Sequence, residues 1–92
     1  MRALRTSRVR QARSVKTVDF YTRQGCHLCE AALAIVEPIA RECGAQLRLH
    51  DIDEDVALQE RYGELVPVVN IDGERHAQWR VYESELRAAL VE

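Results

Sequence analysis

Apolar and polar residues follow one another along the chain in patterns that predict short strands and helices. The run Thr-Val-Asp-Phe-Tyr at 17–21 is rich in residues that favour strands. Apolar residues then recur at spacings of three and four, which indicates one face of a helix. This face consists of Leu28, Ala32, Ile35, Val36, Ile39 and Cys43. Gly44 is placed to end the helix, and Pro38 is expected to bend it without ending it.

The second half of the chain continues with the same two patterns. The predicted strands cover 46–52, 66–71 and 74–79, and the predicted helices are a short one that ends at Gly63 and a last one over roughly 82–91. We expect Leu47 and Leu49 on the better-buried face of the first of these strands. Asp53 or Asp55 is expected to cap the short helix. The Asp-Gly pair at 72–73 favours a hairpin turn between the last two strands.

The order of elements is therefore β-α-β-α-β-β-α. Its first three elements form a βαβ unit, whose crossover is expected to be right-handed. The hairpin then completes a four-stranded mixed sheet flanked by helices, so we predict an α/β fold. With 92 residues, the chain is long enough for one domain and too short for a second core.

The charge is distributed unevenly along the chain. Residues 1–16 carry six bases and no acid, whereas 17–92 carry the other seven bases and all 15 acids. We predict a disordered basic arm at 1–16 and a folded domain at 17–92. The arm lacks aromatics and an apolar stripe, so a solvated tail is favoured over nucleic-acid binding or a transit peptide.

The remaining composition limits where the protein is expected to work. No apolar run approaches the roughly 18 residues of a membrane span, and no signal-peptide core is evident, so we expect a cytoplasmic protein with no membrane or nucleic-acid partner. Three cysteines in a short chain do not suggest a disulfide framework. A monomer is expected.

Two of the cysteines, Cys26 and Cys29, form a C-x-x-C pair where the first strand leads into the first helix. Unpaired backbone N–H groups at a helix N-terminus stabilise a thiolate, and C-x-x-C motifs in such settings lower the thiol pKa well below about 8.5. Arg23 and His27 are close enough in sequence to add positive potential. Cys29 lies one turn further along, where it can attack a mixed disulfide on Cys26. This hypothesis requires that neither sulfur is walled off and that the two can bridge.

Cys43 is not expected to take part. It follows Cys26 by 17 residues, or about 25 Å along a helix at 1.5 Å per residue. We predict a buried core thiol there.

The C-x-x-C lies between the first strand and the first helix, and Val66-Pro67 stands at the start of a later strand. In these features the chain resembles the thioredoxin superfamily, and within it the glutaredoxin-like branch. The segments that carry the likeness are Phe20 to Glu30, Asp51-Ile-Asp53, Tyr62-Gly63, Leu65-Val-Pro67 and Asp72-Gly73. The resemblance covers about 17–92. It implies a thioredoxin-like fold and thiol-disulfide exchange, with a redox-active disulfide and a part in electron transport. By the same resemblance, Cys26 is the nucleophile, Cys29 is the resolving thiol, and Pro67 is cis.

The resemblance also suggests how substrate binds. A cis peptide at Pro67 would expose the backbone of Val66 beside Cys26, where an extended substrate can pair with it as an added strand. Arg23 and His27 complete the predicted substrate-binding set. The expected partner is a disulfide-containing protein or a low-molecular-weight thiol. Glutathione is a weaker candidate, because Arg23 replaces a glutathione-contacting lysine and the paired glycines of classical glutaredoxins are missing.

Two other functions use the same residues. Soft thiolate ligands also select copper(I), zinc or iron-sulfur clusters, so a metal or cluster carrier is an alternative. A redox-silent interaction module is the third. We favour the oxidoreductase, with no cofactor and no metal site. His50 and His76 are interpreted as ordinary surface or packed histidines, Trp79 and Tyr82 as core residues, and Asp19 receives no role.

Overall fold

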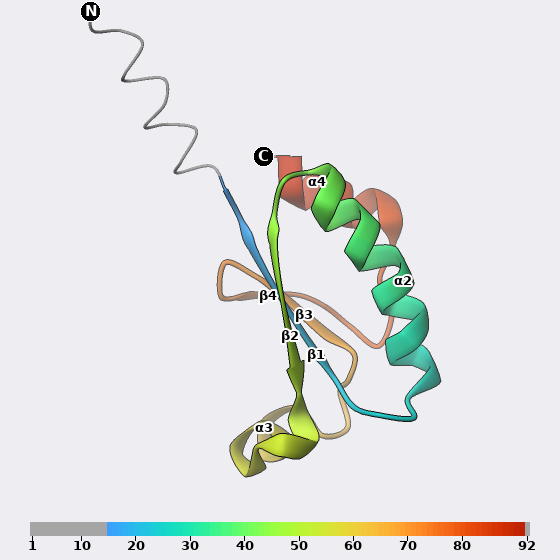
Figure 1. The fold of residues 1–92 in the computed structure, drawn as a ribbon, viewed down its shortest axis with the longest axis vertical. Coiled ribbons are helices and arrows are strands. Elements are labelled where there is room, and N and C mark those ends of the chain that lie inside the picture. Colours follow the sequence, from blue (N-terminus) through green and yellow to red (C-terminus); the bar gives the residue numbers. More distant parts are fainter. Residues whose placement is uncertain (1–14, 92) are drawn as a thin grey trace, which may run out of the picture.

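The computed structural model describes residues 15–91 and contains eight elements, drawn in Figure 1. The strands are β1 (Thr17–Thr22), β2 (Gln46–Asp51), β3 (Val68–Ile71) and β4 (Glu74–Gln78). The helices are α2 (His27–Glu42), α3 (Val56–Tyr62), α4 (Glu83–Val91) and a short 3-10 turn at Ile52–Glu54. The predicted order of strands and α-helices is confirmed. The predicted arm at 1–16 lies, except for its last two residues, outside the described residues.

The four strands form one mixed sheet in the order β2-β1-β3-β4. β1 and β2 are parallel, and the other two pairs are antiparallel. Asp72 and Gly73 have φ values of 51° and 87° and make the hairpin turn, as predicted from their tolerance of positive φ. The Asp72 carboxylate also accepts a 2.9 Å hydrogen bond from the N–H of Thr17, which ties this turn to the start of β1.

Helices α2 and α4 cover one face of the sheet and enclose the main core between helix and strand (Figure 1). Phe20 of β1 is fully buried at the centre of this cluster. Its other buried members are Val18, Ala32, Val36, Ile39, Val69, Val81, Leu86 and Leu90. Alternation along β1 directs Val18 and Phe20 to this face. α2 runs through Pro38 without ending, as expected.

Local signals explain how the helices begin and end. Asp55 caps α3, and its carboxylate accepts a 2.9 Å hydrogen bond from the N–H of Ala57, so the predicted aspartate cap is confirmed. Gly44 follows the end of α2 with a φ of 72°, the left-handed conformation that glycine adopts most easily. Among residues 15–91, every helix is too short or too polar to span a bilayer.

Several residues predicted to be buried are not. Leu28 is 52% exposed and Leu49 is 56% exposed, because Leu28 lies in the first turn of α2 and Leu49 lies on the edge strand β2. Trp79 and Tyr82, which were predicted to be core, lie in the connection between β4 and α4 and are 51% and 54% exposed. Cys43 is half-buried rather than buried, because it caps the end of α2. Periodicity predicts which side a residue faces, but not how far the covering layer extends.

Candidate redox site

Cys26 is the N-cap of α2, where the sequence predicted it. Its backbone is extended, with φ of −98° and ψ of 107°, and the helix begins at the next residue. The Cys26 sulfur accepts a hydrogen bond from the N–H of Cys29 at 3.1 Å. A sulfur in this position faces the unpaired N–H groups and the positive end of the helix macrodipole. This environment favours a negative charge on the Cys26 sulfur.

Cys26 and Cys29 are joined by a disulfide bond, with their Cα atoms 5.2 Å apart. Cys26 is partly buried, whereas only 1% of the Cys29 surface is accessible. The two cysteines can bridge, as required, but the requirement that neither sulfur be walled off is not met by Cys29, which packs beside Tyr62 and Val68 in a second buried cluster. This burial has a chemical consequence. Of the two cysteines, only Cys26 is open to a molecule in the solvent.

The peptide bond between Val66 and Pro67 is cis, as the resemblance implied. Val66 belongs to the same cluster as Cys29, and Cys26 packs against that cluster. The structure therefore brings the loop before β3 to the two cysteines across 40 residues of sequence. Among the described residues, no hydrogen bond involves the backbone of Val66. The C=O of Pro67 accepts a 2.8 Å hydrogen bond from the N–H of Trp79.

Arg23 and His27 differ in how firmly the structure holds them. The Arg23 guanidinium forms a 2.8 Å ion pair with Asp53 and donates a 2.9 Å hydrogen bond to the C=O of Gly63. The hydrogen bond to Asp53 and its charge raise the pKa of Arg23. Arg23 thus connects the loop before Cys26 to Asp53, which precedes α3, and to Gly63, which follows it. The His27 side chain is almost fully exposed, 4.0 Å from the Glu30 carboxylate.

Sequence reasoning missed a polar cluster centred on Asp19. This carboxylate is buried and accepts two hydrogen bonds from Arg48, at 2.8 and 3.1 Å, while His50 lies 2.7 Å away. Tyr21 stacks on His50 and contacts Tyr62, with ring centroids 4.6 and 4.3 Å apart. Contacts therefore connect Asp19, through His50 and Tyr21, to Tyr62 in the cluster that contains Cys29.

A sequence signal for this cluster did exist. Asp19 pairs in register with Arg48 on the neighbouring parallel strand. His50 lies two residues beyond Arg48, so all three side chains share one face of the sheet. Finding them required knowledge of the register between two strands, which periodicity within each strand does not supply.

Hydrogen bonding by Arg48 holds the pKa of Asp19 below its ordinary value, and His50 adds to this effect against the opposing effect of burial. A carboxyl with a lowered pKa in the folded state contributes stability above its unfolded pKa of about 3.9, and that stability is lost as the pH falls through the folded value. We expect Asp19→Asn to lower the free energy of unfolding by roughly 1–2 kcal/mol at pH 7. Urea unfolding at pH 7 and at pH 3 or below tests this.

The loss should shrink as the pH falls below 4, because the wild-type carboxyl then becomes protonated. Asp72→Asn is the matched control at the hairpin turn, since Asp72 accepts a single backbone hydrogen bond. A pH-independent effect of Asp19→Asn would show that the charge on Asp19 is not what stabilises the fold.

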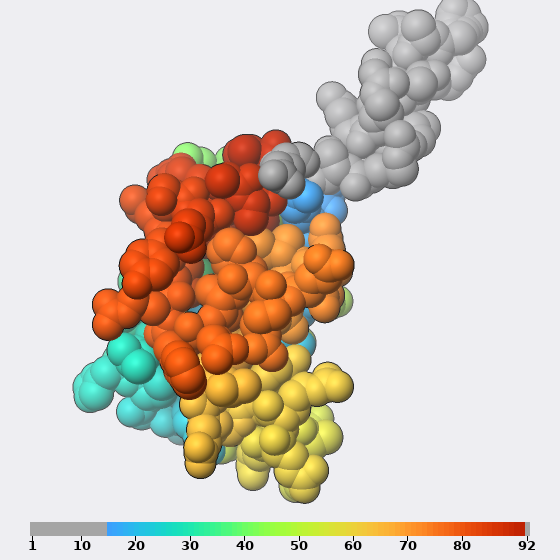
Figure 2. Space-filling model, turned by 180° about the vertical axis from the view of Figure 1, so that it is seen from behind, coloured from blue at the N-terminus to red at the C-terminus, as the bar shows by residue number. Residues whose placement is uncertain are grey.

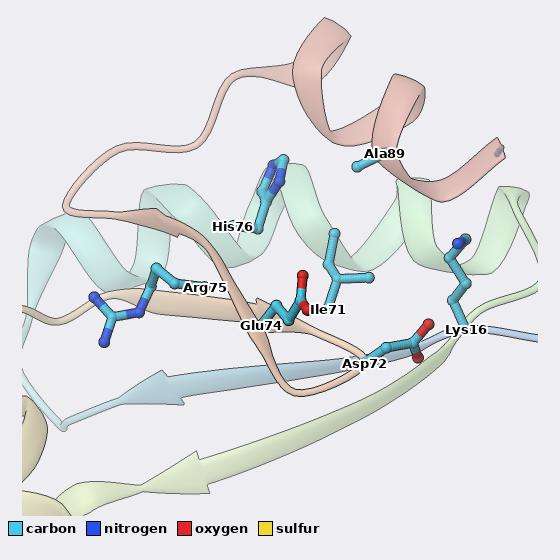
Figure 3. Close-up of a pocket in the computed structure, with 7 residues that line it drawn as sticks. All are labelled: Lys16, Ile71, Asp72, Glu74, Arg75, His76 and Ala89. Carbon is cyan, nitrogen blue, oxygen red and sulfur yellow. The ribbon is translucent and has the colours of Figure 1, made fainter.

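A hollow away from the cysteines lies between the β3–β4 hairpin and α4 (Figure 3). It has a volume of about 420 Å³ and is lined by Lys16, Ile71, Asp72, Glu74, Arg75, His76 and Ala89. Figure 3 shows His76 directed toward α4 and Arg75 on the opposite side of β4. Within residues 15–91, no group of three or more His, Cys, Asp or Glu side chains is placed to hold a metal ion.

Comparison with known families and proteins gives one family and several relatives. The model of the glutaredoxin-like domain (DUF836) matches residues 17–91. Uncharacterized protein Rv0508 of Mycobacterium tuberculosis is 32% identical over 78 residues, which make up 79% of this chain and 80% of the relative. Uncharacterized protein Mb0520 of Mycobacterium bovis matches to the same extent.

Solved structures show the same fold. Protein XcR50 from X. campestris is 30% identical and superposes with a TM-score of 0.61, covering 79% of this chain and 93% of that one. A mutant thioredoxin from Halobacterium salinarum is 25% identical, with a TM-score of 0.64 and coverage of 82% and 71%. These likenesses confirm the predicted thioredoxin-like fold.

Proposed function

We propose that this protein, which belongs to the glutaredoxin-like domain (DUF836) family, is a small dithiol oxidoreductase that reduces disulfide bonds. The observation that carries the proposal is the position of Cys26 at the N-cap of α2, with the buried Cys29 bonded to it. This arrangement supplies an accessible nucleophile and a protected second thiol. Membership in the family also confirms the resemblance inferred from the sequence.

The reaction uses both thiols of the reduced protein. The Cys26 thiolate attacks one sulfur of a substrate disulfide, forming a mixed disulfide and releasing the other substrate sulfur as a thiolate. The Cys29 thiolate then attacks the Cys26 sulfur, which releases the second substrate thiol and forms the Cys26–Cys29 disulfide. Two electrons pass to the substrate, whose two sulfurs take up two protons. To complete the cycle, a dithiol or two monothiols must supply two electrons and two protons to reduce the Cys26–Cys29 disulfide.

Contacts around the site support a polypeptide substrate. Val66 packs in the same cluster as Cys29, and its backbone forms no hydrogen bond within the described residues, which leaves its N–H and C=O for pairing with a substrate strand. Arg23, the candidate for contact with glutathione, is already paired with Asp53 and Gly63. This pairing favours a disulfide-containing protein over glutathione as the partner.

Cys29→Ser tests the proposal, because it removes the resolving step and leaves the nucleophile. We expect the reduced variant to accumulate a covalent adduct with a disulfide-linked peptide dimer, visible as one added peptide in the intact mass. The wild-type protein should pass through this adduct and release both peptides.

Cys43→Ser is the matched control, since Cys43 lies at the far end of α2 and bonds to neither redox cysteine. It should behave as the wild-type protein does. The absence of any adduct on Cys29→Ser, or an adduct attached at Cys43, would contradict the proposal.

A further inference from the structure

Trp79 occupies an unfavourable position for a tryptophan in two respects. Its φ of 70° lies in the left-handed region, where a bulky side chain is rare and costs conformational free energy. Its side chain is also half-exposed, although a large aromatic gains most from burial. Strain of this kind persists only when the surrounding structure enforces it, and it gathers at functional sites.

Two hydrogen bonds enforce this conformation, and both join Trp79 to the loop that holds the cis-proline. The N–H of Trp79 donates to the C=O of Pro67 at 2.8 Å. The indole Nε1–H donates to the C=O of Glu64 at 3.0 Å. The indole ring is therefore held at a fixed place beside the segment that carries Val66, while one side of it stays open to solvent.

Trp79 forms one wall of an apolar groove whose lining includes Leu28 of the redox motif. The other wall comes from the first turns of α2, and Figure 2 shows the segment after β4, in deep orange, beside the turquoise start of this helix. The main lining residues are Leu28, Ala31, Ile35, Trp79, Val81 and Tyr82. Leu28 stands between the two cysteines in sequence. Leu28, Trp79 and Tyr82 are each about half-exposed, and large exposed apolar patches are typical of binding surfaces.

The volume and charge of the groove limit what can fill it. Its volume is about 200 Å³, below the range of about 300–1,000 Å³ typical of sites for drug-sized ligands. One large apolar side chain is the better match. Arg80 carries the only charge among the residues that line the groove, so a neighbouring acidic residue on the occupant is favoured.

We propose that this groove binds a large apolar side chain of the polypeptide that flanks a substrate disulfide, and that Trp79 is a specificity-determining residue. The inference rests on the proposed function, because Leu28, which lines the groove, lies two residues after Cys26, where the mixed disulfide would form. The occupant is thus a cystine-bearing segment with a leucine or aromatic residue near its cysteine and an acidic residue beside it.

Two disulfide-linked peptide dimers test the inference. The peptides of both dimers carry a glutamate at the same position. At the position two residues from the cysteine, one peptide has leucine and the other has serine. The reduced protein is mixed with each in a single turnover, and release of peptide thiol gives a second-order rate constant. We expect the leucine dimer to react about tenfold faster, the discrimination typical of one apolar side chain in a pocket.

Trp79→Gly removes the indole and relieves the positive φ, because glycine adopts it without strain. Leu28→Ser alters the opposite wall. Both variants should bring the ratio of the two rate constants close to one. Leu49→Ser, which changes an equally exposed leucine outside the groove, should keep the tenfold ratio.

The possible failures are distinct. If the wild-type protein reduces neither dimer, the proposed function is overturned, and the inference with it. If the wild-type protein reduces both dimers at equal rates, the groove does not select substrate and only the inference is overturned. A tenfold ratio that survives in both Trp79→Gly and Leu28→Ser would overturn it as well.

Discussion

Cys26→Ser is expected to reduce the rate of disulfide reduction at least about 100-fold, which corresponds to about 2.7 kcal/mol of transition-state stabilisation. The serine hydroxyl stays protonated at neutral pH and cannot replace a thiolate as nucleophile. Serine is also a favoured N-cap, so its oxygen can accept the hydrogen bond that the Cys29 N–H now gives to sulfur, and α2 should begin where it does now. The loss is therefore chemical rather than structural.

Single-turnover reduction of a disulfide-linked peptide dimer measures this loss, and circular dichroism checks that the variant is folded. Cys43→Ser is again the matched cysteine control and should keep the wild-type rate. If Cys26→Ser retained more than half of the activity, Cys26 would not be the attacking sulfur, and another thiol would have to carry the reaction.

Phe20→Ala is expected to lower the free energy of unfolding by about 3–5 kcal/mol, because it opens a cavity in a fully buried site. Phe20 lies at the centre of the cluster between β1, α2 and α4. In a small domain, a loss of this size is a large part of the total stability, so a substantial unfolded fraction is expected at 37 °C. Urea denaturation followed by circular dichroism gives the change.

Leu49→Ala provides a matched control on the neighbouring strand. Leu49 pairs in register with Phe20 but is 56% exposed at the edge of the sheet. Its replacement should change the free energy of unfolding by no more than about 0.5 kcal/mol. Equal losses in the two variants would show that Phe20 is not part of a tightly packed core.

Trp79 shows why part of the binding surface could not be predicted from the sequence. An aromatic residue between a strand and a helix is most often buried, and this was the prediction. The positive φ and the two hydrogen bonds to the loop before β3 turn the indole outward instead. Both bonds join residues more than ten positions apart, so no local pattern contains them.

Local signals in the sequence were enough to predict the order of the elements and the redox motif. Period-2 and helical spacings, the Asp55 cap and the Asp72-Gly73 turn are local signals, since each depends on residues a few positions apart. The position of Cys26 at a helix start follows from the same local information. These predictions succeeded because the physical causes lie within the segment itself.

Which residues meet depends on how distant segments pack in the folded chain. The tertiary structure buries Cys29 while leaving Cys26 accessible, brings the Val66 loop to them, and joins Asp19 to Arg48 and His50. It also leaves Leu28 exposed at the mouth of the apolar groove. Strand register and the extent of each covering helix set these outcomes, because both arise from packing between segments that are far apart in the chain.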